Sequence, residues 1–598
     1  MKTKNLTTRN IAIIAHVDHG KTTLVDKLLQ QSGTLDVSGK DRVMDSNALE
    51  QERGITILAK NTGIEYDGYK INIVDTPGHM DFGGEVERTL QMVEGFILLV
   101  DAAEGVLPGT RFVLKKALAL GLKPIVVINK IDRPDADIEN VEEMVHDLFL
   151  ELATHDSQLE FPVLYGSGRL GFMNDDASIR SGTMKPLLDA IVKLIPAPAY
   201  HAEPLQLLVT NLSYSDFLGA IAVGRVFSGS LRVGDQFIMC KDDTVSKQMR
   251  VTKIYGFKGL DKVEQDTAEC GDIVAVTGFT EEPAIGATLC LPGQPAPRDY
   301  VAIDEPTIAI NFSVNDSPFN GREGKLLTSR QILERLQTEL KTNVALRVEQ
   351  TDSADTFKVS GRGQLHLGIL IETMRREGFE LQISAPEVLY KTINGHKYEP
   401  IETVYIDVPS EHQGVVIENL GKRKAELRDM QQSSDDRVHM VFEVPSRGLF
   451  GFRGQFLTDT RGTGTLNFSF HGYQPYKGDI PSRNKGSLVS MENGTVRAYA
   501  LDGLQPRGIL FVEPGQETYE GMIVGEHSRD NDLDVNPCKE KKLTNMRASG
   551  TDEAVKLAPA RKMSLEQALE WIRPDELIEV TPKSIRLRKK VLRASMRK

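Results

Sequence analysis

The chain has 598 residues and a formal net charge of −12, and 40% of its residues are hydrophobic. A chain of this length is too long to fold around a single hydrophobic core, and it corresponds to about four or five domains of ordinary size. The composition is that of a globular protein without low-complexity regions, and no apolar run reaches the ~18 residues that a membrane-spanning helix needs.

The first residues, Met1–Asn10, are too short and polar to act as a signal peptide. The cysteines are widely separated and form no CxxC pair: Cys240, Cys270, Cys290 and Cys538. We therefore expect a cytoplasmic protein with reduced thiols rather than disulfides or a thiolate metal site.

Residues 1–200 alternate short apolar strands with amphipathic helical patterns. The predicted strands are Ile11–Ala15, Ile71–Asp75, Phe96–Asp101 and Pro124–Asn129, and the helices include Thr22–Gln31 and Arg111–Leu120. This alternation predicts a doubly wound α/β domain with a mainly parallel sheet. The segment Pro196–Ala199 is the predicted linker at its end.

The rest of the chain divides into four further predicted domains. Short β-rich runs separated by Gly-Asp and Ser-Gly turns predict a small β-barrel over residues 201–300. Residues 301–388 and 396–479 each read as an α+β sandwich, with helices at Thr328–Lys341, Gly363–Glu377 and near Gln413–Glu426. Residues 480–598 are mainly β-like, with one helix at Ser564–Ile572.

A phosphate-binding loop is predicted between the first strand and the first helix. The segment Ala15–Thr22 has the P-loop pattern, although Ala15 replaces the usual first glycine. Its backbone N–H groups and the helix N-terminus would hold the phosphates. Lys21 would neutralise the β- and γ-phosphates, and the Thr22 hydroxyl would bind Mg²⁺.

Two more motifs stand at strand ends, and a third lies in the segment between strands, in the order that a GTP site needs. Asp75 begins Asp-Thr-Pro-Gly, where it can reach Mg²⁺ through water and the Gly78 N–H can bond the γ-phosphate. Thr56 lies between the motifs and can complete the Mg²⁺ coordination. Asp132 ends Asn-Lys-Ile-Asp, and its carboxylate can accept from N1–H and the 2-amino group of guanine, which adenine lacks.

These motifs define the candidate nucleotide site, with a backbone N–H near Ser167 facing guanine O6. The predicted nucleotide-binding residues are Val17, Asp18, His19, Gly20, Lys21, Thr22, Thr23, Gly78, Asn129, Lys130, Ile131, Asp132 and Ser167. The predicted Mg²⁺ ligands are Thr22, Thr56 and, through water, Asp75. Glycine-rich turns and helix caps are the alternative explanation of each motif taken alone.

The charge is distributed unevenly along the chain. Lys539–Lys598 holds 16 basic and 8 acidic residues, and Lys583–Lys598 holds eight basic and no acidic ones. A basic pole on an acidic body suggests contact with a polyanion, whereas a solvated basic tail is the equally weighted alternative. The RNA-contact candidates are Lys539, Lys541, Lys542, Arg547, Lys589 and Lys590, with a polar loop predicted over Asn536–Glu553.

The combination of Arg53-Gly54-Ile55-Thr56 with Asp75-Thr76-Pro77-Gly78-His79 resembles the translational GTPases. Beyond the first domain the chain resembles the BipA/TypA family, above all in Lys541–Glu553, Val359–Leu367 and Pro445–Leu449. The resemblance implies a P-loop GTPase domain, a translation-factor β-barrel, two ferredoxin-like domains and a family-specific C-terminal domain.

The resemblance also implies the catalytic roles. His79 would position the attacking water on the ribosome, restrained beforehand by Val17 and Ile55, while Lys21 and Thr56 support phosphoryl transfer. The implied partners are both ribosomal subunits, the sarcin–ricin loop of 23S rRNA, A-site tRNA and ribosomal proteins, for a monomer without membrane attachment.

The resemblance implies a bacterial GTPase that assists large-subunit assembly and translation under stress or cold. Two alternatives remain open. One is a core elongation factor with translocase or back-translocase activity, although about a dozen residues near Pro386–Glu399 leave no room for a translocase's extra domain. The other is a regulatory GTPase that does not act on ribosomes.

Overall fold

The computed structural model describes residues 7–16, 18–34, 48–53, 60–76, 83–202, 204–215, 217–300, 305–343, 345–432, 436–480, 483, 485–540 and 556–597. The chain divides into two compact units, which we describe separately. The first comprises residues 1–304 with 341–344, and the second comprises residues 305–340 with 345–598.

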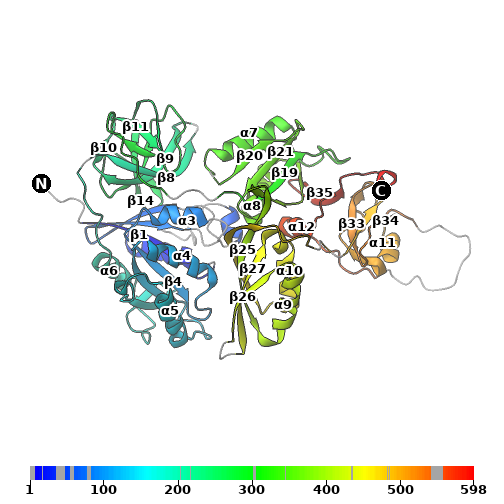
Figure 1. Ribbon diagram of the computed structural model, residues 1–598, viewed down its shortest axis with the longest axis horizontal. Helices are drawn as coiled ribbons and strands as arrows, with labels where there is room; N and C mark the ends of the chain where they lie inside the picture. The colour runs from blue at the N-terminus through cyan, green and yellow to red at the C-terminus, as the bar shows by residue number, and fades with distance from the viewer. Residues whose placement is uncertain are drawn as a thin grey trace, which may run out of the picture. The chain divides into compact units, whose positions relative to one another are not determined.

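The first unit begins with a seven-stranded sheet in the order β2-β3-β1-β4-β5-β6-β7. Its central strands β1 and β4 are labelled in Figure 1. Its strands are β1 Thr8–Ala15, β2 Lys60–Tyr66, β3 Tyr69–Asp75, β4 Gly95–Asp101, β5 Lys123–Asn129, β6 Val163–Ser167 and β7 Phe172–Asn174. The central pairs are parallel, and β2 and β7 add antiparallel edges. The predicted mainly parallel sheet is therefore confirmed, while the antiparallel edge strands were not predicted.

Helices cover both faces of this sheet. They are α1 Lys21–Gln31, α2 Ala48–Arg53, α3 Gly83–Leu90, α4 Pro108–Ala119, α5 Ile138–Leu152 and α6 Lys185–Leu194. Alternate residues of each strand point to opposite faces. Ile11 and Ile13 of β1 accordingly pack with α1 and α6, whereas Ala12 and Ile14 pack with α3, α4 and α5.

The same unit contains an antiparallel sheet in the order β12-β11-β18-β8-β9-β17-β14-β15. Its strands are β8 Gln206–Ser215, β9 Gly219–Ser228, β11 Gln236–Lys241, β12 Thr244–Val245, β14 Lys253–Lys258, β15 Asp261–Gln265, β17 Ile273–Thr277 and β18 Thr288–Cys290. Also present are β13 Met249–Arg250, paired with β11, and the ribbon of β10 Ser230–Arg232 with β16 Thr267–Glu269. Side chains from β8, β9, β11, β14, β17 and β18 share one core, as the predicted barrel requires.

Backbone contacts join the barrel to the α/β sheet within this unit. Gly63 in β2 and Gly259 exchange two hydrogen bonds, of 3.2 and 2.7 Å. A Cβ atom on Gly63 would lie 2.1 Å from the Phe257 carbonyl oxygen, so this close approach requires glycine. Arg225 of the barrel also forms an ion pair with Glu94 at the start of β4.

The second unit contains a sheet in the order β20-β21-β19-β22-β35-β36, with β23 paired to β19. Its strands are β19 Ile308–Val314, β20 Arg347–Gln350, β21 Thr356–Gly361, β22 Leu381–Ser384, β23 Glu387–Val388, β35 Glu576–Val580 and β36 Ile585–Lys589. Three helices share its core: α7 Ser329–Leu340, α8 Gln364–Arg376 and α12 Leu565–Trp571. The predicted α+β sandwich thus includes two strands from the end of the chain.

Two further parts complete the second unit. One sheet has the order β24-β25-β27-β26, with β28 paired to β25. Its elements are β24 Lys391–Ile393, β25 His396–Pro409, α9 Gln413–Lys422, β26 Glu426–Gln432, β27 Arg437–Pro445, α10 Phe452–Asp459 and β28 Thr465–Pro475. The other sheet contains β29 Ser487–Ser490, β31 Gly508–Leu510, β33 Ile523–His527 and β34 Leu533–Val535. Beside it lie α11 Ala498–Leu504 and the pair β30 Gly494–Thr495 with β32 Glu517–Thr518.

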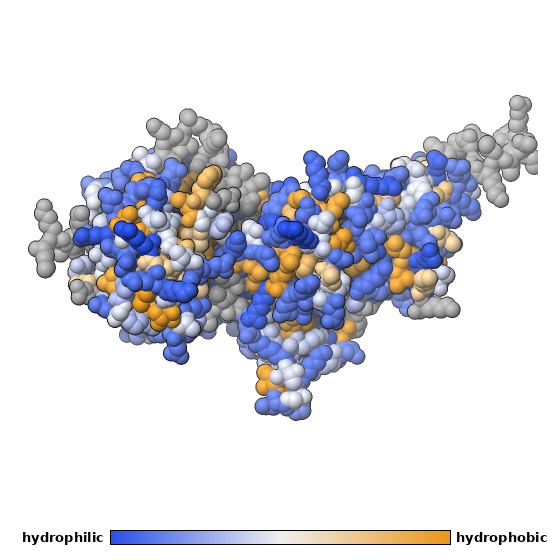
Figure 2. Space-filling model, turned by 90° about the horizontal axis from the view of Figure 1, so that it is seen from above, coloured by the Kyte–Doolittle hydropathy of each residue, from blue (hydrophilic) through white to orange (hydrophobic). Residues whose placement is uncertain are grey.

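The hydropathy of one face of the molecule is drawn in Figure 2. Apolar residues appear there in separate small patches surrounded by hydrophilic ones, as on ordinary water-exposed protein surfaces. Among the helices of the described residues, none has the length and apolar content to cross a membrane.

Candidate functional site

The predicted phosphate loop lies between β1 and α1, at the carboxyl end of the sheet. Asp18 and Gly20 both have positive φ, at 66° and 94°. A Cβ atom on Gly20 would lie 2.6 Å from Asn129 Nδ2, so this position requires glycine. Among the described residues, no side chain caps the start of α1. The N–H groups of this helix end therefore point toward the site where an anion binds favourably.

Lys21 and Asp75 meet at this edge of the sheet. The Lys21 side chain is only 8% exposed, and its Nζ lies 2.9 Å from Asp75 Oδ1 and donates to the Thr76 carbonyl. The Thr76 hydroxyl donates to the Ile13 carbonyl at 2.7 Å, which ties the ends of β1 and β3 together. Thr22 is the second residue of α1. A cation and a carboxylate are thus gathered where phosphates and Mg²⁺ were predicted.

The segments predicted to recognise guanine meet around Asn129. Its Nδ2 donates to the His19 carbonyl at 2.8 Å, and its Oδ1 accepts from the Gly168 N–H at 2.8 Å. The Ile131 N–H also donates to the Gly166 carbonyl at 3.2 Å. One side chain therefore joins the phosphate loop to both segments that were predicted to face the base.

The base-facing residues themselves occupy different environments. Asp132 is exposed on the loop after β5, where its carboxylate can reach a ligand. Ser167 is buried, and its hydroxyl accepts from the Leu170 N–H at 3.2 Å, which stabilises the turn that carries it. Lys130, within the Asn129–Asp132 segment, has a positive φ of 61°.

Asp101 is a site-supporting residue that the sequence reasoning did not identify. Its fully buried carboxylate lies 2.6 Å from Lys130 Nζ and accepts from the Ala103 N–H at 2.8 Å. Burial alone would raise the pKa of Asp101, but these partners outweigh burial and hold the pKa below its usual value. The available signal was an apolar strand, Gly95–Asp101, that ends in a carboxylate at the same sheet edge.

His19 contributes through its backbone, because its ring points into the domain. Nδ1 lies 3.3 Å from the Leu99 carbonyl oxygen. Burial, followed by the nearby His16, lowers the pKa of His19 to about 4. The ring is therefore neutral at pH 7 and fixes the phosphate loop against β4.

Several predicted residues lie outside the described part of the chain. They are Val17, Ile55, Thr56, Gly78 and His79 at the nucleotide site, and Lys541, Lys542 and Arg547 in the C-terminal region. The structure therefore brings together the phosphate loop, Asp75 and the segments predicted to recognise guanine, and the roles of the site residues stay predictions.

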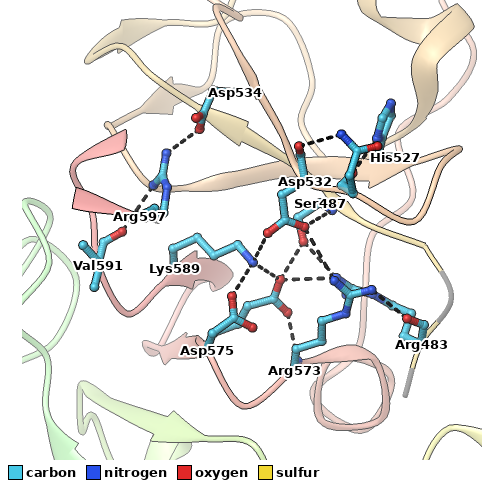
Figure 3. Close-up of polar contacts among 12 residues, drawn as sticks. Arg483, Ser487, His527, Asp532, Asp534, Arg573, Asp575, Lys589, Val591 and Arg597 are labelled. Carbon is cyan, nitrogen blue, oxygen red and sulfur yellow. Dashed lines mark hydrogen bonds and ion pairs between the residues drawn. The ribbon is translucent and has the colours of Figure 1, made fainter. Parts of the chain in front are cut away.

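The basic residues of Lys583–Lys598, called the basic tract below, pair in part with carboxylates of the protein, and Figure 3 shows two of them, Lys589 and Arg597. The Lys589 side chain is 2% exposed, and its Nζ lies 2.5 Å from Asp532, 2.8 Å from Asp575 and 2.9 Å from Glu576. These three carboxylates are close enough to one another for a metal ion, but the Lys589 ammonium group already lies among them. The prediction that Lys589 contacts RNA is therefore wrong for this structure, because the ammonium group is enclosed by protein carboxylates.

Neighbouring cations of the tract are paired in the same way. Arg588 is buried against Asp316 and Gln382, Arg586 pairs with Glu323, and Arg597 pairs with Asp534. Lys539 and Lys590 are exposed and stay candidates for RNA contact. Ion pairs and hydrogen bonds of the basic tract thus link the end of the chain to the rest of the second unit.

We expect Lys589→Met to destabilise the second unit by about 2–3 kcal/mol. Removing one partner of a buried ion pair costs about 3–5 kcal/mol, and we place the loss below that range because Asp532 and Asp575 are partly exposed. The measurement is the shift of the thermal unfolding transition. Lys590→Met is the matched control, since it removes an exposed cation from the next position and should change stability by less than about 0.5 kcal/mol. Equal shifts for both variants would show that the ion pairs of Lys589 do not stabilise the second unit.

Four family descriptions match successive parts of the chain. Residues 6–197 match the elongation factor Tu GTP binding domain, and residues 219–290 match elongation factor Tu domain 2. Residues 396–484 match the elongation factor G C-terminus, and residues 485–594 match the TypA/BipA C-terminal domain. The first match covers the whole nucleotide site described above, which identifies it as a GTP site.

Full-length relatives are named large ribosomal subunit assembly factor BipA. The protein of that name from Bacillus subtilis is 54% identical over 593 residues, which cover 98% of this chain and 97% of the relative. Those from Synechocystis and Salmonella typhimurium are each 53% identical, over 98% of this chain and 98% and 97% of the relatives. The similarity thus extends through every part of the chain.

A solved structure of a protein from Thermus thermophilus has a related fold. It aligns with a TM-score of 0.56 at 17% identity, covering 78% of this chain and 97% of that one. At this identity the likeness supports the fold alone.

Proposed function

The chain belongs to the TypA/BipA family of GTPases, and from this we propose that it hydrolyses GTP to GDP and phosphate on the bacterial ribosome and assists large-subunit assembly. The observation that carries the proposal is that Asn129 links the phosphate loop to the segments that would recognise guanine, through hydrogen bonds to the His19 carbonyl and the Gly168 N–H. The full-length relatives of this chain are named assembly factors. A role in translation under stress or low temperature is the wider form of the same proposal.

In this mechanism the protein binds GTP through two sets of groups. The N–H groups at the start of α1, together with Lys21, hold the phosphates, and Asp132 accepts from the guanine edge. Asp101 keeps Lys130 in place beside the base. These groups position the nucleotide before any chemistry takes place, and so they lower the entropic part of the barrier.

The donor set at the phosphate end fits Mg²⁺, a hard cation that prefers oxygen ligands. Thr22 and Thr56 would supply hydroxyl oxygens, and Asp75 would act through water, beside Lys21. When bound, Mg²⁺ would offset the charge that develops on the phosphate oxygens during transfer to water. His79 would orient the attacking water, with Val17 and Ile55 as the gate that restrains it.

The proposed partners follow from the family. They are both ribosomal subunits, the sarcin–ricin loop as the external positioner of His79, A-site tRNA and ribosomal proteins, and the protein would act as a monomer in the cytoplasm. The competing translocase function lacks room for an extra domain, because β23 ends at Val388 and β25 begins at His396. These residues carry only the short strand β24 between them.

Co-sedimentation tests the proposed function directly. With a non-hydrolysable GTP analogue the protein should pellet with ribosomes, and with GDP it should stay largely in the supernatant. Cells lacking the protein should accumulate incomplete large subunits, which sucrose gradients resolve. A protein that never pellets with ribosomes would instead be a regulatory GTPase of another kind.

The basic segment that includes Lys541, Lys542 and Arg547, which the sequence predicts to be a loop, should contribute to ribosome binding. Replacing all three with Ala should weaken binding and flatten its dependence on salt, by up to about one unit of log–log slope for each lost phosphate contact. Binding isotherms at several salt concentrations provide the measurement. GTP affinity of the free variant is the control, because the nucleotide site lies in the other unit. An unchanged affinity and salt slope would show that the loop is a solvated surface segment.

A further inference from the structure

A cleft of about 570 Å³ opens in the second unit beside β36. Part of its wall is apolar, and Phe511, Met563 and Leu587 contribute to it from three separate segments. This volume lies in the range of sites that hold small organic ligands. The cleft is far along the chain from the GTP site and belongs to the other unit.

Cations predominate in the lining of this cleft. Two lining residues carry carboxylates, Glu323 and Glu517. Six carry positive charge: Arg322, Arg375, Arg561, Lys562, Lys583 and Arg586. The lining therefore has a formal charge of +4, which favours an anionic ligand.

Further carboxylates pair with these cations from outside the lining. Glu372 holds Arg375 through two bonds of 2.7 Å, and Arg375 Nη1 also donates to the Pro582 carbonyl at 3.0 Å. Glu513 lies 3.1 Å from Lys562, and Glu526 lies 4.0 Å from Arg561 Nη1. Such partners fix the orientation of each cation.

Planar groups lie next to the cationic ones. The Arg322 guanidinium lies 4.2 Å from the centre of the Phe319 ring, and that of Arg586 lies 5.2 Å from it. Guanidinium planes and apolar side chains are surfaces on which an unstacked base can lie. Lys583 is exposed at the cleft, and within the described residues no carboxylate pairs with it.

We propose that this cleft binds a nucleoside phosphate, with the phosphate against Lys583 and Arg561 and the base against the apolar wall. The ligand must combine an anionic group with a flat apolar body, because the cleft presents both kinds of surface. The choice of a nucleotide among such ligands rests on the ribosomal role proposed above, since RNA supplies unstacked nucleotides. A free nucleotide has the same chemistry and is the second source.

The test uses the full-length protein with its GTP site saturated by GDP. The probes are a fluorescein-labelled single-stranded RNA of six adenosines, followed by anisotropy, and unlabelled AMP as competitor. Adenine is chosen because Asp132 selects guanine at the other site. Lys583→Ala combined with Arg561→Ala should lower the affinity for the RNA about 10-fold or more, since charge-assisted hydrogen bonds are lost.

Lys590→Ala is the matched control, because Lys590 is an exposed cation of the same tract that does not line the cleft. It should leave the affinity for the probe unchanged, and GDP affinity should be the same in all variants. Competition by AMP would identify free nucleotide as a ligand, and binding of the RNA alone would identify an RNA-borne nucleotide; either outcome supports the proposal.

The proposal is overturned if neither probe binds, if the double variant binds as the wild type does, or if Lys590→Ala weakens binding equally. Each result is obtained without ribosomes. A negative result would therefore not contradict the proposed ribosome binding, which co-sedimentation tests separately.

Discussion

Asp132→Asn should reverse the base preference of the protein, lowering its affinity for GTP and raising that for xanthosine triphosphate. The Asp132 carboxylate accepts from N1–H and the 2-amino group of guanine, whereas an Asn amide can donate to the 2-oxo group of xanthine. A site built to pair with a polar group rejects a ligand that cannot pair by roughly 10⁴-fold, so the ratio of the two affinities should change by about 10³-fold or more. Isothermal titration with both nucleotides measures this ratio.

Asp135→Asn is the control for this substitution. Asp135 is an exposed carboxylate three residues further on, where it pairs with Arg133 at 2.6 Å rather than with a ligand. Its replacement should leave the base preference unchanged. Unchanged guanine affinity in Asp132→Asn would mean that the base-recognition site has been assigned to the wrong segment.

His79→Ala should separate binding from catalysis. The variant should keep its affinity for GTP and ribosomes but lose ribosome-stimulated turnover by about 10²-fold or more, because positioning of the attacking water is a large share of the barrier. Phosphate release in a single turnover with saturating ribosomes is the measurement. Lys21→Ala should behave differently and weaken nucleotide binding itself, since Lys21 lies in the phosphate loop.

His146→Ala provides the comparison for His79→Ala. His146 is a half-exposed histidine on α5 of the same domain, stacked on Phe161 at 5.0 Å between ring centres. It should retain full stimulation. If His79→Ala also retained stimulation, the water would have to be positioned by another group.

The nucleotide site was predictable because its parts are local. Each motif follows directly on an apolar strand, and the carboxyl ends of parallel strands meet at one edge of a sheet. Thus Lys21, Asp75 and Asn129 were correctly expected to lie together. Asp101 was missed because its role depends on Lys130, which lies on the neighbouring strand connection and shares no motif with it.

The C-terminal region was less predictable because its pairings are distant in sequence. The basic run Lys583–Lys598 contains no acidic residue, and it therefore suggested a solvated or RNA-facing surface. Several of its counter-charges come from distant residues, Asp316, Glu323 and Asp532, which no local pattern connects to it. Likewise, nothing in Glu576–Lys589 indicates that these strands join the sheet of residues 308–388.

The pairing of β22 with β35 has a consequence for synthesis of the chain. Ser384 pairs with Leu577, which is made roughly 190 residues later. At translation rates of about 5–20 residues per second, this edge of β22 stays unpaired for about 10–40 seconds before its partner strand has been synthesised. An unpaired strand edge is prone to join other chains. A nascent chain released early, before residue 576, would therefore keep this edge open and should be a preferred substrate for chaperones.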